Sequence, residues 1–162
     1  MSEQSDGCSA WLRELHRKSV AHHRELLEGA IGGGKDPREV VGEYFDELEN
    51  YLQAGEFAGC PFTNAATALE QQVGDEEAGA VRSEVESHKL SIRDFFVAVA
   101  KLVDDSPGRA RHLGEVLFLM YSGATTEAKN LRETWPVARA RAAALQMIEA
   151  ERSRIVAGEV VK

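Results

Sequence analysis

The segment from Pro107 to Leu131 constrains the fold of this chain most, because it is apolar on nearly every side of a helix. One apolar stripe recurs at spacings of three and four residues, and further apolar side chains extend it around the helix. The stripe comprises Leu113, Val116, Leu117, Met120 and Ala124, and its extension comprises Phe118, Leu119 and Tyr121. A helix of this kind must be covered on every side. The sequence therefore predicts that other helices or a second subunit surround it.

The remainder of the chain shows the same helical spacing, and no stretch alternates as a half-buried strand would. Glycine and proline separate the predicted helices, which span about residues 9–31, 37–54, 62–72, 75–103, 107–131 and 135–157. The 162 residues suit one domain. We therefore expect an all-α fold, a single helical-bundle domain of about six helices over residues 9–158. Residues 1–8 are expected to be a disordered segment and residues 159–162 a tail.

Two of the predicted helix boundaries are indicated by residues next to them in the sequence. Asp36 can cap a helix whose first position is Pro37, and Glu39 completes a capping box. The glycine run at 32–34 stops the preceding helix. Lys35 follows those glycines without the spacing or the preceding strand of a phosphate loop, which indicates a linker.

Charge and cysteine usage exclude several classes of function. There are 27 acidic and 19 basic side chains and a formal net charge of −8, which disfavours broad contact with nucleic-acid phosphates. Cys8 and Cys60 lie far apart and outside any C-x-x-C pattern, so neither a disulfide framework nor a zinc ribbon is indicated. The start lacks the pattern of a signal peptide, and the longest apolar run, Val116–Tyr121, is too short to span a bilayer. We expect a cytoplasmic protein that binds neither membrane nor DNA directly.

Histidines interrupt two apolar stripes. The first predicted helix carries Leu12, His16, Ser19, His23 and Leu26 along one side. A polar group within such a stripe suggests a lined cavity, and the alternative is a solvated histidine at the rim. A third histidine, His88, lies between Val85 and Ile92, where a buried imidazole needs a hydrogen-bond partner or a ligand. A satisfied core histidine is the alternative there.

Motifs for catalysis are missing. A di-iron bundle needs Glu-x-x-His pairs, and only the reversed order occurs, from His112 to Glu115. No HExxH, nucleophilic triad or dinucleotide-binding glycine pattern appears. Cys60 at a predicted helix start is either a small structural residue or a thiol whose pKa the helix N-terminus lowers. We expect neither an enzyme nor a bound metal or cofactor.

Two stretches resemble the C-terminal domain of TetR-family transcriptional regulators. Residues 59–66, Gly-Cys-Pro-Phe-Thr-Asn-Ala-Ala, resemble the family's GC-x-x-x-N-x-A stretch. Residues 117–129, with Ser122-Gly123-Ala124 at the centre and Ala128-Lys129 at the end, resemble the penultimate helix at the dimer contact. The likeness covers about residues 10–157. It implies a ligand-binding domain for transcription regulation, in which helices enclose an apolar cavity and the last two helices form a homodimer.

One part of the family's pattern lies outside this resemblance. Members of that family begin with a three-helix DNA-binding unit, for which the chain before Trp11 is too short. We therefore expect a regulatory domain without its own DNA-binding head. The alternative is a headless interaction protein that dimerises with or titrates a complete regulator. A small metal-dependent helical-bundle enzyme is a third interpretation.

The helix faces and the resemblance together predict two sets of residues. A small apolar effector would contact His23, Leu26, His88, Ile92, Phe95, Phe96, Phe118 and Tyr121. The homodimer would use Val116, Leu117, Met120, Gly123, Ala124, Ala140, Ala144, Leu145 and Ile148. Gly123 would allow the backbone of a second subunit to come close. The alternative is that the last two helices pack only into the core of their own domain.

Overall fold

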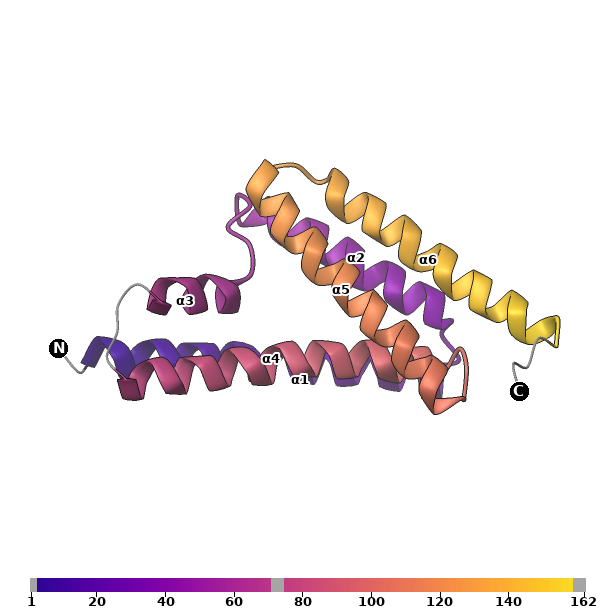
Figure 1. Ribbon diagram of the computed structural model, residues 1–162, viewed down its shortest axis with the longest axis horizontal. Coiled ribbons are helices and arrows are strands. Elements are labelled where there is room, and N and C mark those ends of the chain that lie inside the picture. The colour runs from indigo at the N-terminus through magenta and orange to yellow at the C-terminus, as the bar shows by residue number, and fades with distance from the viewer. Residues whose placement is uncertain (1–2, 71–74, 159–162) are drawn as a thin grey trace.

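The computed structural model describes residues 3–70 and 75–158 (Figure 1). They form six helices: α1 (Glu3–Gly33), α2 (Pro37–Ala54), α3 (Pro61–Glu70), α4 (Asp75–Lys101), α5 (Pro107–Leu131) and α6 (Trp135–Val156). These ranges contain no strand, and the predicted all-α single domain is confirmed. None of the helices in these ranges has the length and apolar character needed to cross a bilayer.

Helices α1 and α4 lie side by side and run in the same direction along the long axis of the molecule (Figure 1). Three contacts along the pair keep nearly the same sequence offset. Arg13 Nε donates to Glu84 Oε1 at 2.9 Å, and the rings of His16 and His88 meet 5.9 Å apart. Further along, His23 stacks on Phe95 at 4.7 Å between ring centroids. The parallel register therefore places histidines of α1 opposite ring-bearing residues of α4.

Helices α2, α5 and α6 run obliquely to that pair (Figure 1). Helix α6 is antiparallel to α2, and two ion pairs along them show this. Arg141 near the middle of α6 donates to Asp46 at 3.0 Å. Arg152 near its end binds both carboxylate oxygens of Asp36, the cap of α2. These two arginines of α6 therefore face α2.

Helix α5 crosses α4 in close contact at Gly114. A Cβ atom at this position would lie 2.5 Å from the Cα atom of Val97. Such a separation is far below van der Waals contact, so glycine is the side chain that permits the crossing. The crossing anchors the first half of α5 on α4.

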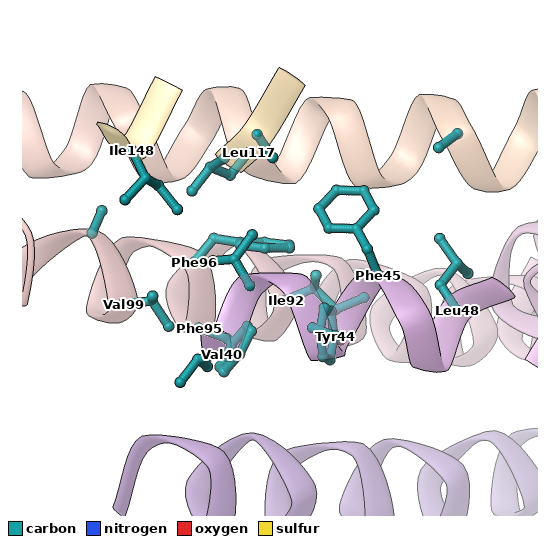
Figure 2. Close-up of a cluster of buried hydrophobic side chains, with 14 of the residues drawn as sticks. Val40, Tyr44, Phe45, Leu48, Ile92, Phe95, Phe96, Val99, Leu117 and Ile148 are labelled. Carbon is teal, nitrogen blue, oxygen red and sulfur yellow. The ribbon is translucent and has the colours of Figure 1, made fainter. Parts of the chain in front are cut away.

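The main core lies where α2, α4, α5 and α6 meet (Figure 2). It is dominated by side chains that are at most 6% exposed. Those labelled in Figure 2 are Val40, Tyr44, Phe45, Leu48, Ile92, Phe95, Phe96, Val99, Leu117 and Ile148. Burial of such apolar area is the dominant favourable contribution to folding. The predicted apolar stripes of the second, fourth and fifth helices therefore converge in one core.

A second and much smaller apolar group, here called the α3 cluster, lies between α1, α3 and α4. Its fully buried members are Leu12, Phe62 and Val81. Partly buried side chains pack around them, including Cys8 and Cys60, which are both free thiols. The α3 cluster holds α3 against the first halves of α1 and α4.

Carboxylates bind the backbone and arginines at two helix starts. Asp36 accepts from the Arg38 backbone N–H at 2.7 Å, which confirms the predicted cap of α2. Asp104 precedes α5 and is 3% exposed. It accepts from the Ser106 backbone N–H at 2.7 Å, from Arg109 Nε at 2.6 Å and from Arg154 Nη2 at 2.9 Å. The Arg109 guanidinium, above all, holds the pKa of Asp104 well below its ordinary value.

The structure corrects one boundary. Helix α1 begins at Glu3, so the expectation of a disordered segment is wrong for residues 3–8, which continue the first helix by two further turns. Three predicted features, the break at Gly74, the end of the third helix near Gln72 and the tail at 159–162, lie outside the described residues. The predicted ends of the second and fifth helices agree with the structure.

Candidate functional site

A histidine and four aromatic rings meet where α1, α2, α4 and α5 come together. His23 Nε2 lies 2.7 Å from the Tyr44 hydroxyl, and the His23 ring stacks on Phe95. Tyr44 also stacks on Tyr121 at 5.0 Å and meets the edge of Phe96 at 5.5 Å. We call this group the aromatic centre. Its polar groups are the imidazole of His23 and the phenols of Tyr44 and Tyr121, and its other two rings are apolar.

Burial controls the protonation of the aromatic centre. His23 is 5% exposed, and desolvation, followed by repulsion from His22 and His16, lowers its pKa to about 4. Burial raises the pKa of the Tyr44 and Tyr121 hydroxyls. At neutral pH the centre therefore contains a neutral imidazole and neutral phenols. Such groups can position a ligand by hydrogen bonds without a net charge.

Two neighbouring histidines, His16 and His88, lie closer to the start of α1 and α4 than the aromatic centre does. The His88 ring stacks face to face on Phe62 of α3, with centroids 3.6 Å apart and planes inclined by 10°. The His16 ring meets it edge-on at 83°. Desolvation, followed by repulsion from Lys89, His16 and His23, lowers the pKa of His88 to about 3. His88 is therefore also neutral at physiological pH.

The Gly-Cys-x-x-x-Asn stretch forms the turn into α3. Gly59 has a φ of 81°, and a Cβ atom there would lie 2.6 Å from Lys129 Cδ of α5. Asn64 donates to the Ala58 carbonyl at 2.8 Å and accepts from the Lys129 ammonium group. Glycine is required here because the backbone is left-handed and the Lys129 stem covers it. These contacts tie the start of α3 to the end of α5.

Cys60 is half-buried in this turn, and Lys89 Nζ lies 3.8 Å from its sulfur. The thiol packs against the α3 cluster. The Tyr51 hydroxyl donates to the neighbouring Gly59 carbonyl at 3.2 Å. Cys60 thus occupies a tight corner between α3 and α4.

The structure brings part of the predicted ligand-binding set together. His23, Phe95, Phe96 and Tyr121 meet in the aromatic centre. Packed in or against the main core are Ile92, Leu26 and Phe118. His88 lies apart from the centre, with Phe62 and His16. The predicted set therefore divides between two places along α4.

Sequence reasoning did not place Tyr44 in the site. Tyr44 belongs to the buried apolar stripe of α2, and its hydroxyl makes the hydrogen bond to His23. A buried tyrosine hydroxyl usually has a hydrogen-bond partner. The presence of a tyrosine among valine, phenylalanine and leucine in that stripe was the available signal.

The predicted dimer residues divide according to burial. Four of them already lie in the core of this chain, at most 5% exposed: Leu117, Ala124, Ala144 and Ile148. They have almost no surface to offer to a second subunit, so the structure places them on the inward side of α5 and α6. Half-buried positions are Val116, Met120, Ala140 and Leu145, and Gly123 is exposed.

Two surface hollows lie outside the aromatic centre. One, of about 590 Å³, follows α1 and is lined by Ala10, Arg13, Glu14, His16, Arg17, Val20, Ala21 and Arg24. The other, of about 440 Å³, lies between α5 and α6 and is lined by Gly108, Arg109, His112, Leu113, Met147, Ala150, Glu151 and Arg154. The first hollow is thus lined by His16, which is one of the two neighbouring histidines described above.

No group of three or more His, Cys, Asp or Glu side chains within residues 3–70 and 75–158 is placed to hold a metal ion. The remaining histidines lie at the surface. His22 Nε2 is 2.6 Å from Glu47, and His112 is exposed on α5. No protein-family profile, curated protein or solved structure matches this chain.

Proposed function

We propose that this chain is a TetR-like regulatory domain that binds a small, mostly apolar effector and forms a homodimer in the cytoplasm. One observation carries the proposal: α5 contributes to the aromatic centre on one side and carries an exposed leucine on another side. Tyr121 packs against Tyr44 and Phe96, while Leu119 is 64% exposed. A single helix therefore connects an interior with ligand-binding chemistry to a surface suited to a partner.

The outer surface of α5 and α6 supports the dimer. Trp135 at the start of α6 is 56% exposed, and a Cβ atom at Gly123 would meet nothing within 4 Å. A twofold contact between two copies of this surface would cover Leu119 and Trp135.

Effector binding would act on the dimer through α5. A ligand that occupies the aromatic centre displaces or orders Tyr121, and the rigid helix transmits that change to its outer side. In a complete regulator this would alter the spacing of attached domains. The acidic net charge of −8 disfavours direct DNA binding by the chain itself.

Light scattering at micromolar concentration tests the dimer. We expect the wild-type chain to be dimeric and the Leu119→Glu variant to be monomeric. Ile31→Glu is the matched control, because Ile31 is a comparably exposed apolar residue on a different helix, α1. A monomeric wild type, or dissociation caused equally by both variants, contradicts the proposal.

Thermal-shift screening with hydrophobic metabolites and drugs tests the effector. A ligand at one hundred times its Kd should stabilise the folded chain by about 2.7 kcal/mol. Tyr121→Leu should abolish the shift. Leu48→Ala is the control, because it removes a core side chain of α2 outside the centre and should lower Tm while preserving the shift. A screen without stabilisers contradicts effector binding.

A further inference from the structure

Two buried imidazole nitrogens in this structure have no hydrogen-bond partner. They are Nδ1 of His16 on α1 and Nδ1 of His88 on α4. His88 is only 8% exposed, and its ring meets that of His16 directly. We call these two residues the histidine pair. Buried polar groups are nearly always hydrogen-bonded, so two adjacent exceptions indicate a missing partner.

The surroundings restrict what that partner can be. A zinc ion would need at least three protein ligands, and no third His, Cys, Asp or Glu joins the pair within the residues that the structure describes. Burial keeps His88 uncharged at neutral pH, which removes the attraction for an anion. The face of Phe62 closes one side of the His88 ring. The partner must therefore be a neutral group that exchanges hydrogen bonds with imidazole.

The hollow along α1 supplies an approach. His16 lines it together with the apolar side chains Ala10, Val20 and Ala21. Three arginines also line the hollow, and two of them are held by carboxylates, since Arg13 binds Glu84 and Arg17 binds Glu14. A ligand in this hollow can therefore contact His16, the member of the histidine pair that lines it.

We infer that the histidine pair is the polar end of a binding site for small neutral hydroxyl compounds of the phenol type. A hydroxyl group both donates and accepts, so it can complement Nδ1 in either imidazole tautomer. An aromatic ring suits the alanine and valine side chains of the hollow and the histidine ring beside them. This inference goes beyond the proposed function, because the histidine pair lies apart from the aromatic centre.

Nitrogen-detected histidine spectra of the full chain, recorded during titration with phenol and with toluene, test the inference. The two probes have the same shape, and only phenol has a hydroxyl group. We expect phenol to shift the Nδ1 resonances of His16 and His88 and toluene to leave them in place. His23 is the internal control, because its Nε2 atom already has Tyr44 as its partner.

Variants separate the pair from the remainder of the protein. We expect His88→Phe and His16→Phe each to weaken phenol binding by about tenfold or more, since each removes one hydrogen-bonding nitrogen. His112→Phe on the exposed side of α5 should have no effect. The comparison of phenol with toluene on the wild type needs no variant, so an unfolded variant does not remove the test.

Three results would overturn the inference: no response to phenol, equal responses to phenol and toluene, or Nδ1 resonances that are already hydrogen-bonded and unmoved because water occupies the site. Its failure differs from that of the proposed function. A stabilising effector that requires Tyr121 but not His88 would leave the regulatory domain intact and remove only the role of the histidine pair.

Discussion

The two ends of the α1–α4 pair contain the same kind of residue in opposite situations. His23 lies where α1 joins the main core, and the Tyr44 hydroxyl satisfies its Nε2 atom at 2.7 Å. His88 lies closer to the other end, near the middle of α4, where Phe62 of the α3 cluster stacks on it and its Nδ1 atom has no partner. Both rings stack on a phenylalanine. Burial and stacking therefore do not distinguish them, and hydrogen bonding does.

This difference separates a structural role from a binding role. A satisfied imidazole contributes to a specific core, whereas an unsatisfied one lowers stability until a partner arrives. The large core provides the stability that the chain needs, so the smaller cluster can keep an unsatisfied group. Three of the four predictions that follow compare the two ends directly.

The largest expected effect comes from deleting an aromatic ring at each end. Phe96→Ala should lower the free energy of unfolding by about 3–5 kcal/mol, because Phe96 is fully buried among α2, α4 and α5. Phe62→Ala should cost less globally and should mainly reduce hydrogen-exchange protection in α3. Urea unfolding and amide exchange measure the two quantities. Equal global losses would show that the α3 cluster is part of the main core.

Acid should destabilise both ends. Because the folded-state pKa values of His23 and His88 are about 4 and about 3, below the ordinary 6.5, the unfolded chain binds more protons. Their contribution is present above pH 6.5 and is lost as pH falls toward the folded values. We expect a loss of about 2 kcal/mol per imidazole between pH 7 and pH 5.

Urea unfolding at these two pH values measures the loss. The pH range lies above the titration of ordinary carboxyl groups, so Asp104 does not contribute. His23→Phe and His88→Phe should each remove about half of the pH dependence. A pH-independent stability between 7 and 5 would mean that neither imidazole is buried as described.

Two glycine substitutions in α5 test how strongly the stability of the main core depends on the close crossing of α5 over α4. Gly114→Ala should destabilise the fold by about 1–3 kcal/mol, because the new methyl group would overlap the Val97 backbone. At a concentration where the chain is monomeric, Gly123→Ala should stabilise it by about 0.5–1 kcal/mol, because the methyl group meets open space and alanine favours the helix. Thermal unfolding of the two variants checks the opposite signs.

The smallest effects come from replacing the histidines themselves at neutral pH. His23→Phe should cost about 1–2 kcal/mol, because it leaves the buried Tyr44 hydroxyl without its partner. His88→Phe should remain within about 1 kcal/mol of the wild type, because it removes a nitrogen that has no partner. Urea unfolding at pH 7 measures both. A larger loss for His88→Phe than for His23→Phe would reverse the comparison.

Local chemistry made the helices readable from the sequence. Apolar spacing, Asp36 with Pro37, and the glycines at 32–34 act within a few residues of themselves, so they predicted the helix boundaries closely. The same periodicity identified His23, Phe95 and Phe96 as inward-facing, and the structure buries all three. It did not show which side of α5 and α6 faces outward, because Leu117 and Ile148 suit a core and a dimer contact equally.

Tertiary structure alone decided which residues meet. The parallel register of α1 and α4 brings His16 to His88, and the crossing at Gly114 directs α5 so that Lys129 reaches the turn at Gly59. No local pattern encodes such encounters, because they depend on packing between helices that are distant in sequence. The sequence by itself determined six helices and the residues on their apolar faces. The packing determined that one buried histidine finds Tyr44 and the other finds no partner.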